Sequence, residues 1–303
     1  RYAIYSKNEL ERYLAQEEIP LHNRVSFPKF LFDRLVDSYG KEKAVDLCLQ
    51  SNQQAPITIR ANSLKTDRSS LMAALGDHEP LATTFASQGI TLKKRMNFFQ
   101  LPQFQQGLFE VQDEGSQLLA DLVQAKPGDH LLDYCAGSGG KTLAFAPLTD
   151  GKGQIYLHDI RSHALLEAKK RLKRAGIQNS QIIFADSPHL KKLKKKMDWI
   201  LVDAPCSGTG TLRRNPDMKW KFNEEMLQRL IGQQRIIFEK ALSFLRPGGK
   251  IVYSTCSLLK EENELQMNHF MATYQLVCEQ KPWSSTPCKD GMDGFFGVVL
   301  KRS

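Results

Sequence analysis

The feature that most constrains the fold is a regular alternation of short apolar runs with helical or loop segments between residues 130 and 254. The runs are rich in Ile, Leu and Val, as strands buried on both faces of a parallel sheet are. The expected strands are residues 130–134, 154–158, 181–185, 197–202 and 250–254. Strand–helix units in succession predict an α/β fold with a Rossmann-like, doubly wound parallel sheet.

The flanking segments have other patterns. Residues 1–52 predict a helical N-terminal segment, with one helix running from Pro28 to Tyr39 and another over residues 42–50. Residues 53–110 predict a small α+β subdomain with strands at 57–60, 89–92 and 97–101 and a helix at 69–75. Residues 111–303 then form the sheet domain, in which residues 275–279 and 295–301 predict an added edge hairpin.

The charge balance concerns partners more than fold. Lys and Arg number 42 against 33 Asp and Glu, so the net charge is +9. This balance favours nucleic acid as a partner, with simple solubility as the alternative. In the small subdomain, basic residues interleaved with Phe98 and Phe99 predict either an RNA-binding face or a solvated face beside core phenylalanines; they are Arg60, Lys65, Lys93, Lys94 and Arg95.

The cysteine pattern argues against a structural zinc site and against disulfides. Six cysteines contain no C-x-x-C pair, so we expect no structural zinc and no other metal. Most lie in or beside strand-like runs, which favours reduced thiols in a cytoplasmic setting. No apolar run approaches the roughly 18 residues of a membrane span, so we expect no membrane partner, and we expect a monomer. The chain opens on Arg1, so an upstream domain or targeting segment remains open.

A glycine-rich turn follows the first sheet strand, in Asp133-Tyr134-Cys135-Ala136-Gly137-Ser138-Gly139-Gly140-Lys141-Thr142. A phosphate-binding P-loop would need glycine where Cys135 stands, and the dinucleotide pattern would need glycine where Thr142 stands. The turn therefore lets the backbone approach a ligand without a full phosphate cradle. S-adenosylmethionine fits that description, because it combines an amino acid with a nucleoside and carries no phosphate.

Two acidic residues at later strand ends agree with a nucleoside cofactor. Asp159 ends the second strand, 22 residues after Gly137, where an acid commonly binds the ribose hydroxyls. Asp186 ends the third strand, where it could accept the adenine amino group. An aspartate at a strand end is often only a helix cap, so neither residue alone would be specific.

Two thiols and a carboxylate end the fourth and fifth strands. Asp203 and Cys206 follow the fourth strand, and Cys256 follows the fifth. These strands adjoin in a doubly wound sheet, so both thiols should border the cofactor crevice. Chemistry that needs a thiol here is methylation of a pyrimidine carbon: a thiolate adding to carbon 6 of cytosine makes carbon 5 nucleophilic. Asp203 could hold the base at its N3 edge.

With these motifs the sequence resembles the RNA cytosine-C5 methyltransferases of the bacterial RsmB (Sun) type, in the RsmB/Nop/NSUN family. The resemblance runs from about Pro28 to the C-terminus and rests most firmly on Asp203-Ala204-Pro205-Cys206-Ser207-Gly208 and Ser254-Thr255-Cys256-Ser257. It also includes residues 60–65, 112–116, 212–220 and 293–296. In this family a class I methyltransferase domain follows a small RRM-like subdomain that helps to bind RNA.

The resemblance implies roles that the residues alone could not rank. Cys256 would be the nucleophile, and Cys206 would assist release of the methylated RNA. The implied cofactor-binding residues are Cys135, Ala136, Gly137, Ser138, Gly139, Gly140, Lys141, Asp159, Asp186 and Asp203. Lys141 would lie close to the site, and the 212–220 segment is similar to the ribosomal-RNA branch, which implies a part in rRNA processing.

Two departures from the family pattern bear on these expectations. The usual Ala-Pro-Gly-Gly turn is here Gly137-Ser138-Gly139-Gly140, and the usual NusB-like helical RNA-binding domain is not in this sequence. The second departure leaves the RNA substrate open. From the resemblance we predict 5-methylcytosine formation in 16S-type ribosomal RNA. Formation of 5-methylcytosine in tRNA, methylation at a base nitrogen, and a non-catalytic RNA-binding role in ribosome assembly remain alternatives.

Overall fold

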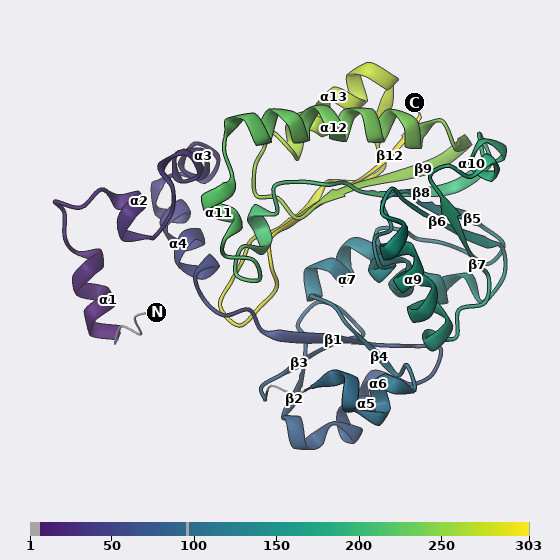
Figure 1. Cartoon of the computed structure of the whole chain (residues 1–303), viewed down its shortest axis with the longest axis horizontal. Helices are drawn as coiled ribbons and strands as arrows, with labels where there is room; N and C mark the ends of the chain where they lie inside the picture. Colours follow the sequence, from purple (N-terminus) through teal and green to yellow (C-terminus); the bar gives the residue numbers. More distant parts are fainter. Residues whose placement is uncertain (1–6, 95–96, 303) are drawn as a thin grey trace.

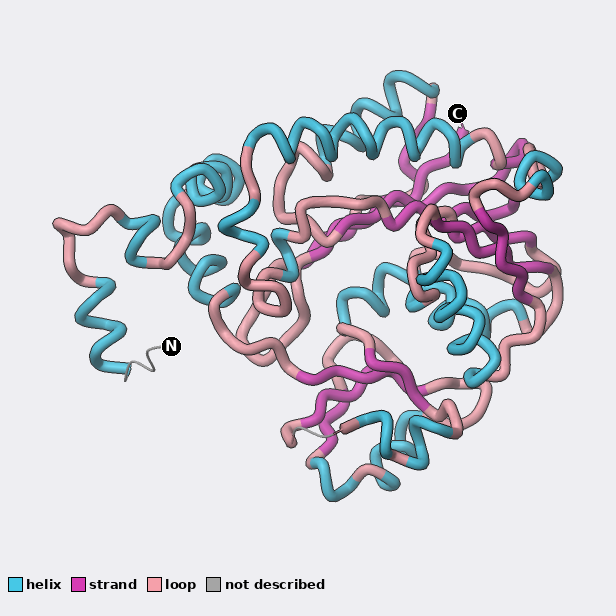
Figure 2. The backbone as a smooth tube through the Cα atoms, in the orientation of Figure 1, coloured by secondary structure: helices cyan, strands magenta, loops and turns pink. Residues whose placement is uncertain are grey.

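A computed structural model describes residues 7–94 and 97–302 of the chain. A large sheet with helices on both faces forms the main body, a small four-stranded sheet lies beneath it, and the N-terminal helices lie at one side (Figure 1). Figure 2 shows the strands of the large sheet gathered between its two helical layers. No helix within these residues is long and apolar enough to cross a membrane.

The N-terminal segment consists of short helices, of which the last two pack on the large domain (Figure 1). They are α1 (Lys7–Leu14), α2 (Leu21–Arg24), α3 (Lys29–Tyr39) and α4 (Lys41–Ser51). Helices α3 and α4 confirm the two helices predicted here. Helix α3 ends at Gly40, whose φ of +80° suits glycine. The buried face of α3 and α4 packs with Leu227 and Leu230 of α12 (Glu224–Leu242) and with Leu258. This segment therefore supports one end of α12.

The small domain is an antiparallel sheet in the order β2-β3-β1-β4. Its elements are β1 (Ile57–Ala61), α5 (Arg68–Ala74), β2 (Pro80–Ala82), β3 (Gly89–Leu92), α6 (Pro102–Gln105) and β4 (Phe109–Val111). Along β1, Ile59 and Ala61 face the domain's own core. The strand predicted over residues 97–101 is wrong, because Asn97 caps a 3₁₀ turn at Phe98–Gln100 and Pro102 then begins α6.

Arg60 does not belong to the basic face predicted on this domain. Arg60 is buried; its Nε donates to Gln112 Oε1 at 2.7 Å and its Nη1 to the Leu143 carbonyl at 2.8 Å. Alternation along β1 turns this side chain toward the large domain, so it joins the two domains instead of facing solvent. Lys65 bonds backbone carbonyls, and Lys93 and Lys94 lie within 4.0 Å of Glu79. Arg95 lies outside the described residues.

The large sheet confirms the doubly wound α/β prediction. Its strands are β5 (His130–Asp133), β6 (Gln154–Asp159), β7 (Ser180–Phe184), β8 (Met197–Asp203), β9 (Leu245–Thr255), β10 (Leu276–Cys278), β11 (Trp283–Ser285) and β12 (Phe295–Arg302). The order is β10-β12-β9-β8-β5-β6-β7, with β11 on β12. Strands β5 to β9 are parallel, and β12 pairs antiparallel with β9. The chain order reverses between β5 and β8, where ligands bind in such sheets.

Helices cover both faces of this sheet (Figure 1). On one face lie α7 (Glu114–Asp121), α8 (Gly140–Phe145) and α9 (Ser162–Ala175); on the other lie α12 and α13 (Glu264–Tyr274). The short helices α10 (Pro188–Lys192) and α11 (Met218–Lys221) complete the set. Successive residues Leu131 and Leu132 of β5 enter opposite apolar layers, as the two-residue period of a strand requires.

Candidate active site

A cleft of about 940 Å³ opens at the carboxyl ends of β5, β6, β8 and β9. Thr58 and Val111 of the small sheet border it, and α12 contributes Gln233, Ile237 and Lys240. The cleft therefore lies where the sheet order reverses and where the two domains meet. Its volume is at the upper end of the range for ligand pockets, large enough for more than one small molecule.

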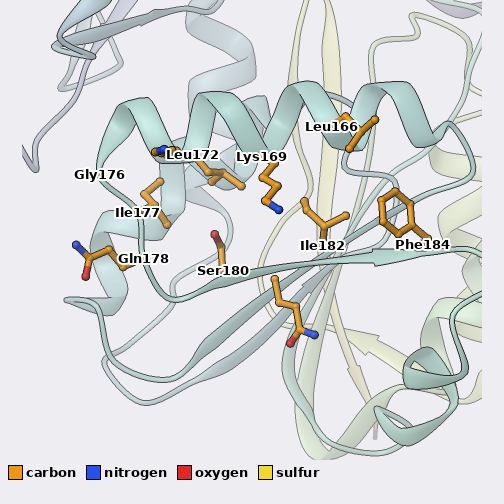
Figure 3. Close-up of a pocket in the computed structure, with 11 residues that line it drawn as sticks. Leu166, Lys169, Leu172, Gly176, Ile177, Gln178, Ser180, Ile182 and Phe184 are labelled. Atoms are coloured by element: carbon orange, nitrogen blue, oxygen red, sulfur yellow. The ribbon is translucent and has the colours of Figure 1, made fainter.

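A second groove, of about 590 Å³, lies between α9 and the edge strand β7 (Figure 3). Leu166, Leu172, Ile177 and Phe184 give it an apolar lining, and Lys169 projects into it. No carboxylate, thiol or histidine lines this groove, so it carries no candidate chemistry.

The two thiols predicted at strand ends meet in the cleft. Cys206 Sγ lies 3.5 Å from Cys256 Sγ, although the residues are 50 positions apart. The contact follows from the sheet, because β8 and β9 pair in parallel with Asp203 opposite Ser254. A hydrogen bond from Cys206 lowers the pKa of Cys256, and the nearby Lys141 acts in the same direction. That bond, together with burial, raises the pKa of Cys206 well above its usual value.

Lys141 and Asp203 form an ion pair beside these thiols. Lys141 Nζ lies 2.5 Å from Asp203 Oδ2, and Ser254 Oγ donates to Asp203 Oδ1 at 3.1 Å. Burial opposes the charge on Lys141, but the Asp203 carboxylate outweighs it and raises the lysine's pKa. The cleft thus holds an ammonium and a carboxylate, paired with each other, next to a thiol whose pKa is lowered.

The glycine turn is built by backbone geometry. Gly137 and Gly139 have φ of +53° and +78°, which glycine adopts without strain. The Gly137 N–H donates to Asp159 Oδ2 at 2.8 Å, so the turn and the end of β6 are joined directly. Burial opposes the charge on Asp159, but hydrogen bonds from Arg161 and Gly137 lower its pKa. Arg161, whose side chain is 58% exposed, covers the outer side of this carboxylate.

Most of the predicted cofactor residues line the cleft. They are Cys135, Ala136, Gly137, Ser138, Gly140, Lys141, Asp159 and Asp203. Gly139 is not among the lining residues, because it packs toward Ala168 on α9. Asp186 is exposed past the end of β7 and does not line the cleft, so its contact with adenine stays a prediction. Cys135 is partly buried, and this desolvation raises its pKa and makes it a poor nucleophile.

The residues present fit S-adenosylmethionine. An acidic side chain, Asp159, and a tight glycine turn border one part of the cleft. Ile160, which is 75% exposed beside Asp159, offers an apolar surface for a base. The turn lacks the full glycine cradle that a phosphate group would need, because Cys135 and Thr142 stand where the phosphate-binding patterns have glycine.

The sequence alone missed a buried ion cluster at one end of the cleft. Asp293 pairs with both Arg213 and Arg214, and Arg214 Nη2 also lies 2.8 Å from Asp113 Oδ2. Burial and the neighbouring Asp293 raise the pKa of Asp113 to about 6. The similarity of residues 212–220 to the family motif was the available signal, but their partners are about 80 and 100 positions away.

Comparison with known proteins decides the family. The family model described as 16S rRNA methyltransferase RsmB/F matches residues 120–300, and a model of its ferredoxin-like domain matches residues 27–98. The probable ribosomal RNA small subunit methyltransferase B of Synechocystis is 33% identical to the chain, over 96% of the chain and 70% of that protein. The chain belongs to the RsmB/F family of RNA methyltransferases.

Other relatives of the RsmB/F family agree. Ribosomal RNA small subunit methyltransferase B of Vibrio vulnificus is 32% identical over 99% of the chain and 72% of that protein. The crystal structure of a methyltransferase homologue from Pyrococcus horikoshii superposes with a TM-score of 0.81 at 26% identity, covering 99% of this chain and all of that one. The predicted family and fold are confirmed, and the predicted cofactor agrees with membership of a methyltransferase family.

Proposed function

We propose that this protein transfers a methyl group from S-adenosylmethionine to carbon 5 of a cytosine in small-subunit ribosomal RNA, through a covalent bond between Cys256 and carbon 6. The observation that carries the proposal is the pair of thiols 3.5 Å apart beside the Lys141–Asp203 ion pair. The names of the RsmB/F relatives support ribosomal RNA as the substrate. Transfer to a base nitrogen would require neither thiol.

The chemistry explains why Cys256 is the nucleophile. Thiolates attack and thiols do not, so the member of the pair with the lowered pKa is the one that adds to carbon 6. The addition places an electron pair on carbon 5, which can then accept a methyl group. S-adenosylmethionine, when bound, supplies that methyl group. Loss of the carbon-5 proton and expulsion of the Cys256 thiolate complete the turnover.

Cys206 fits a role in this last stage. The largest cause of its raised pKa is the hydrogen bond to Cys256, which needs an unmodified Cys256 sulfur. Once Cys256 is bonded to carbon 6, that cause is removed and Cys206 becomes more acidic. We infer that Cys206 then takes part in the proton transfer that allows elimination of the product.

The Lys141–Asp203 pair is suited to orienting the base. Its carboxylate accepts and its ammonium donates, so together they match the mixed edge that cytosine presents at N3 and the exocyclic amine. Asp203 also borders the part of the cleft assigned to the cofactor. We therefore assign Asp203 a catalytic role at the base and a binding role at the cofactor.

The domains divide the work in this proposal. Residues 111–303 carry the cofactor turn and both thiols, while residues 53–110 form the small domain that borders the cleft through Thr58. We infer that this small domain contributes to RNA binding, with Phe99, which is 74% exposed, available for stacking on a base. Residues 1–52 serve mainly to support α12.

The target can be tested in cells. Bisulfite sequencing of ribosomal RNA and tRNA, from cells with and without the gene, should show one or more protected cytosines in 16S-type RNA that vanish when the gene is deleted. Nucleoside mass spectrometry of the same RNA should show loss of 5-methylcytidine. A change confined to tRNA would identify tRNA as the substrate instead of ribosomal RNA. A change in an N-methylated nucleoside would overturn the carbon-5 assignment.

The cofactor site gives a separate prediction. Replacing Asp159 by Asn should weaken S-adenosylmethionine binding by about 10- to 100-fold, because hydrogen bonds to a charged group contribute roughly 1.5–3 kcal/mol. Isothermal calorimetry without RNA measures this directly. The matched control is Asp150→Asn, at an exposed position outside the cleft.

The same titration tests two other assignments. A comparable loss for Asp186→Asn would support the predicted adenine contact, and an unchanged affinity would remove it. Failure of the unaltered protein to bind S-adenosylmethionine, with RNA affinity retained, would favour a non-catalytic assembly factor. Equal affinities for the Asp159 and Asp150 variants would contradict the assigned role of Asp159.

A further inference from the structure

A single buried glutamate connects the two thiol loops. Each cysteine is followed by a serine, and both serines bond the side chain of Glu262. Ser207 Oγ and Ser257 Oγ each lie 2.5 Å from Glu262 Oε2, and the Ser207 N–H donates to Oε1 at 2.9 Å. Glu262 is 0% exposed, so these bonds form away from solvent.

The rest of the environment matches an ionised carboxylate. Gln234 of α12, also fully buried, donates its Nε2 to Glu262 Oε1 at 2.9 Å and to the Pro205 carbonyl at 3.0 Å. Thr209 Oγ1 lies 3.2 Å from both serine hydroxyls. Burial raises the pKa of Glu262, and the hydrogen bonds donated by Ser207, Ser257 and Gln234 oppose that rise, since an ionised carboxylate only accepts. Within the described part of the chain, no lysine or arginine forms an ion pair with it.

We propose that Glu262 is a positioning residue that holds the Cys206 and Cys256 loops together and determines which of the two thiols keeps the proton. This inference rests on the proposed function, since it concerns the same pair of thiols. Glu262 does not line the cleft, so it acts through its neighbours and not on the substrate.

The charges around the pair are asymmetric in the required direction. Behind Cys206 lie the Glu262 carboxylate and the phenol of Tyr253, which donates to the Glu262 carbonyl at 2.8 Å. On the cleft side, Lys141 and Asp203 face Cys256. The hydrogen bond between the thiols is the largest cause of the raised pKa of Cys206 and of the lowered pKa of Cys256. The negative charge of Glu262 adds to the rise at Cys206, whereas Lys141 lowers the pKa of Cys256 against the opposing effects of burial and Asp203. These opposite directions favour the proton on Cys206 and thiolate character on Cys256.

The hydrogen-bonded bridge from Ser207 through Glu262 to Ser257 also helps to set the distance between the two sulfur atoms. The sequence separates the two loops by about 50 residues, and β8–β9 pairing alone ends at Asp203 and Ser254. Beyond Asp203 and Thr255 the two strands end, so other contacts help to set the separation of the sulfurs. They include the Gly210 N–H bond to the Cys256 carbonyl at 2.9 Å, the direct contact of the Ser207 and Ser257 hydroxyls at 3.1 Å, and the Ser207–Glu262–Ser257 bridge.

The test is thiol alkylation, read at each cysteine by peptide mass spectrometry. Unaltered protein is treated with sub-stoichiometric iodoacetamide, without RNA or cofactor, over a range of pH. At a pH of about 7.5, Cys256 should react at least about tenfold faster than Cys206, because alkylation follows the thiolate fraction. In Glu262→Gln the ratio should fall several-fold toward one, through faster reaction of Cys206. An unchanged ratio in a folded variant would overturn the proposal.

Controls separate charge from fold. Glu264→Gln, an exposed neighbour, should leave the ratio unchanged, and Glu262→Asp, which keeps the charge, should restore part of it. Circular dichroism and thermal melting report whether each variant is folded. If Glu262→Gln does not fold, the unaltered protein still decides, since equal alkylation midpoints for the two thiols would overturn the proposal. Alkylation involves no methyl transfer, so its outcome can be read even if the proposed reaction is wrong.

Discussion

Replacing Cys256 by Ala should abolish methylation of ribosomal RNA, with a loss of at least about 1,000-fold in turnover, the scale seen when a catalytic nucleophile is removed. Carbon 5 of cytosine is too weak a nucleophile to attack a methyl sulfonium without prior addition at carbon 6. No other thiol lining the cleft can replace Cys256, since the pKa values of Cys206 and Cys135 are both raised. Transfer of a radiolabelled methyl group to 16S-type RNA measures the loss.

The matched control is Cys288→Ala, which removes an exposed thiol outside the cleft. It should methylate at the normal rate. Calorimetry should show that Cys256→Ala still binds S-adenosylmethionine, because the glycine turn and Asp159 are untouched. Intact methylation by a folded Cys256→Ala protein would eliminate the covalent mechanism and return base-nitrogen methylation as the leading assignment.

Replacing Cys206 by Ala should have the opposite signature: the first half of the reaction proceeds and the second half stalls. Cys256 can still add to carbon 6, but the group inferred to assist proton transfer and release is missing. A covalent protein–RNA adduct should therefore accumulate, visible as a band of reduced mobility in a denaturing gel. Most of the active protein should be trapped when RNA and cofactor are in excess.

The double variant Cys206→Ala/Cys256→Ala provides the decisive comparison, since it should form no adduct. Loss of the slow band after ribonuclease treatment would identify RNA as its partner. Clean product release by Cys206→Ala, with no adduct at any time, would contradict the division of labour between the thiols. In that case Asp203 or solvent would have to perform the proton transfer assigned to Cys206.

Much of this fold follows from local patterns. The apolar runs between residues 130 and 254 form the parallel strands of the sheet, and the predicted strands at 275–279 and 295–301 are confirmed as β10 at the edge and β12 beside it. The secondary-structure predictions that are wrong or missing also concern short segments. The 97–101 segment had a strand-like pattern, but Asn97 and Pro102 favour a 3₁₀ turn and a helix start. The sequence pattern does not predict strand β4, because three residues give too little periodicity to detect.

The candidate site depends partly on contacts that local sequence patterns do not predict. Sequence order placed Asp203, Cys206 and Cys256 at one edge of the sheet because parallel strands all end on the same side. It could not show that Lys141 pairs with Asp203, or that Arg60 turns inward to meet Gln112. Nor did any motif point to Glu262, since its serine partners lie on loops whose approach depends on strand register.

The sequence by itself thus determined the parallel sheet, the adjacency of its fourth and fifth strands, and the set of reactive groups at their ends. Those depend on the continuous apolar runs of strands buried on both faces and on the right-handed connection between parallel strands, which are local or general properties. Only the tertiary structure decided that the two sulfurs lie 3.5 Å apart and that their surroundings make them unequal. The physical reason is that a pKa depends on burial and on charges brought close by folding, whatever their separation along the chain.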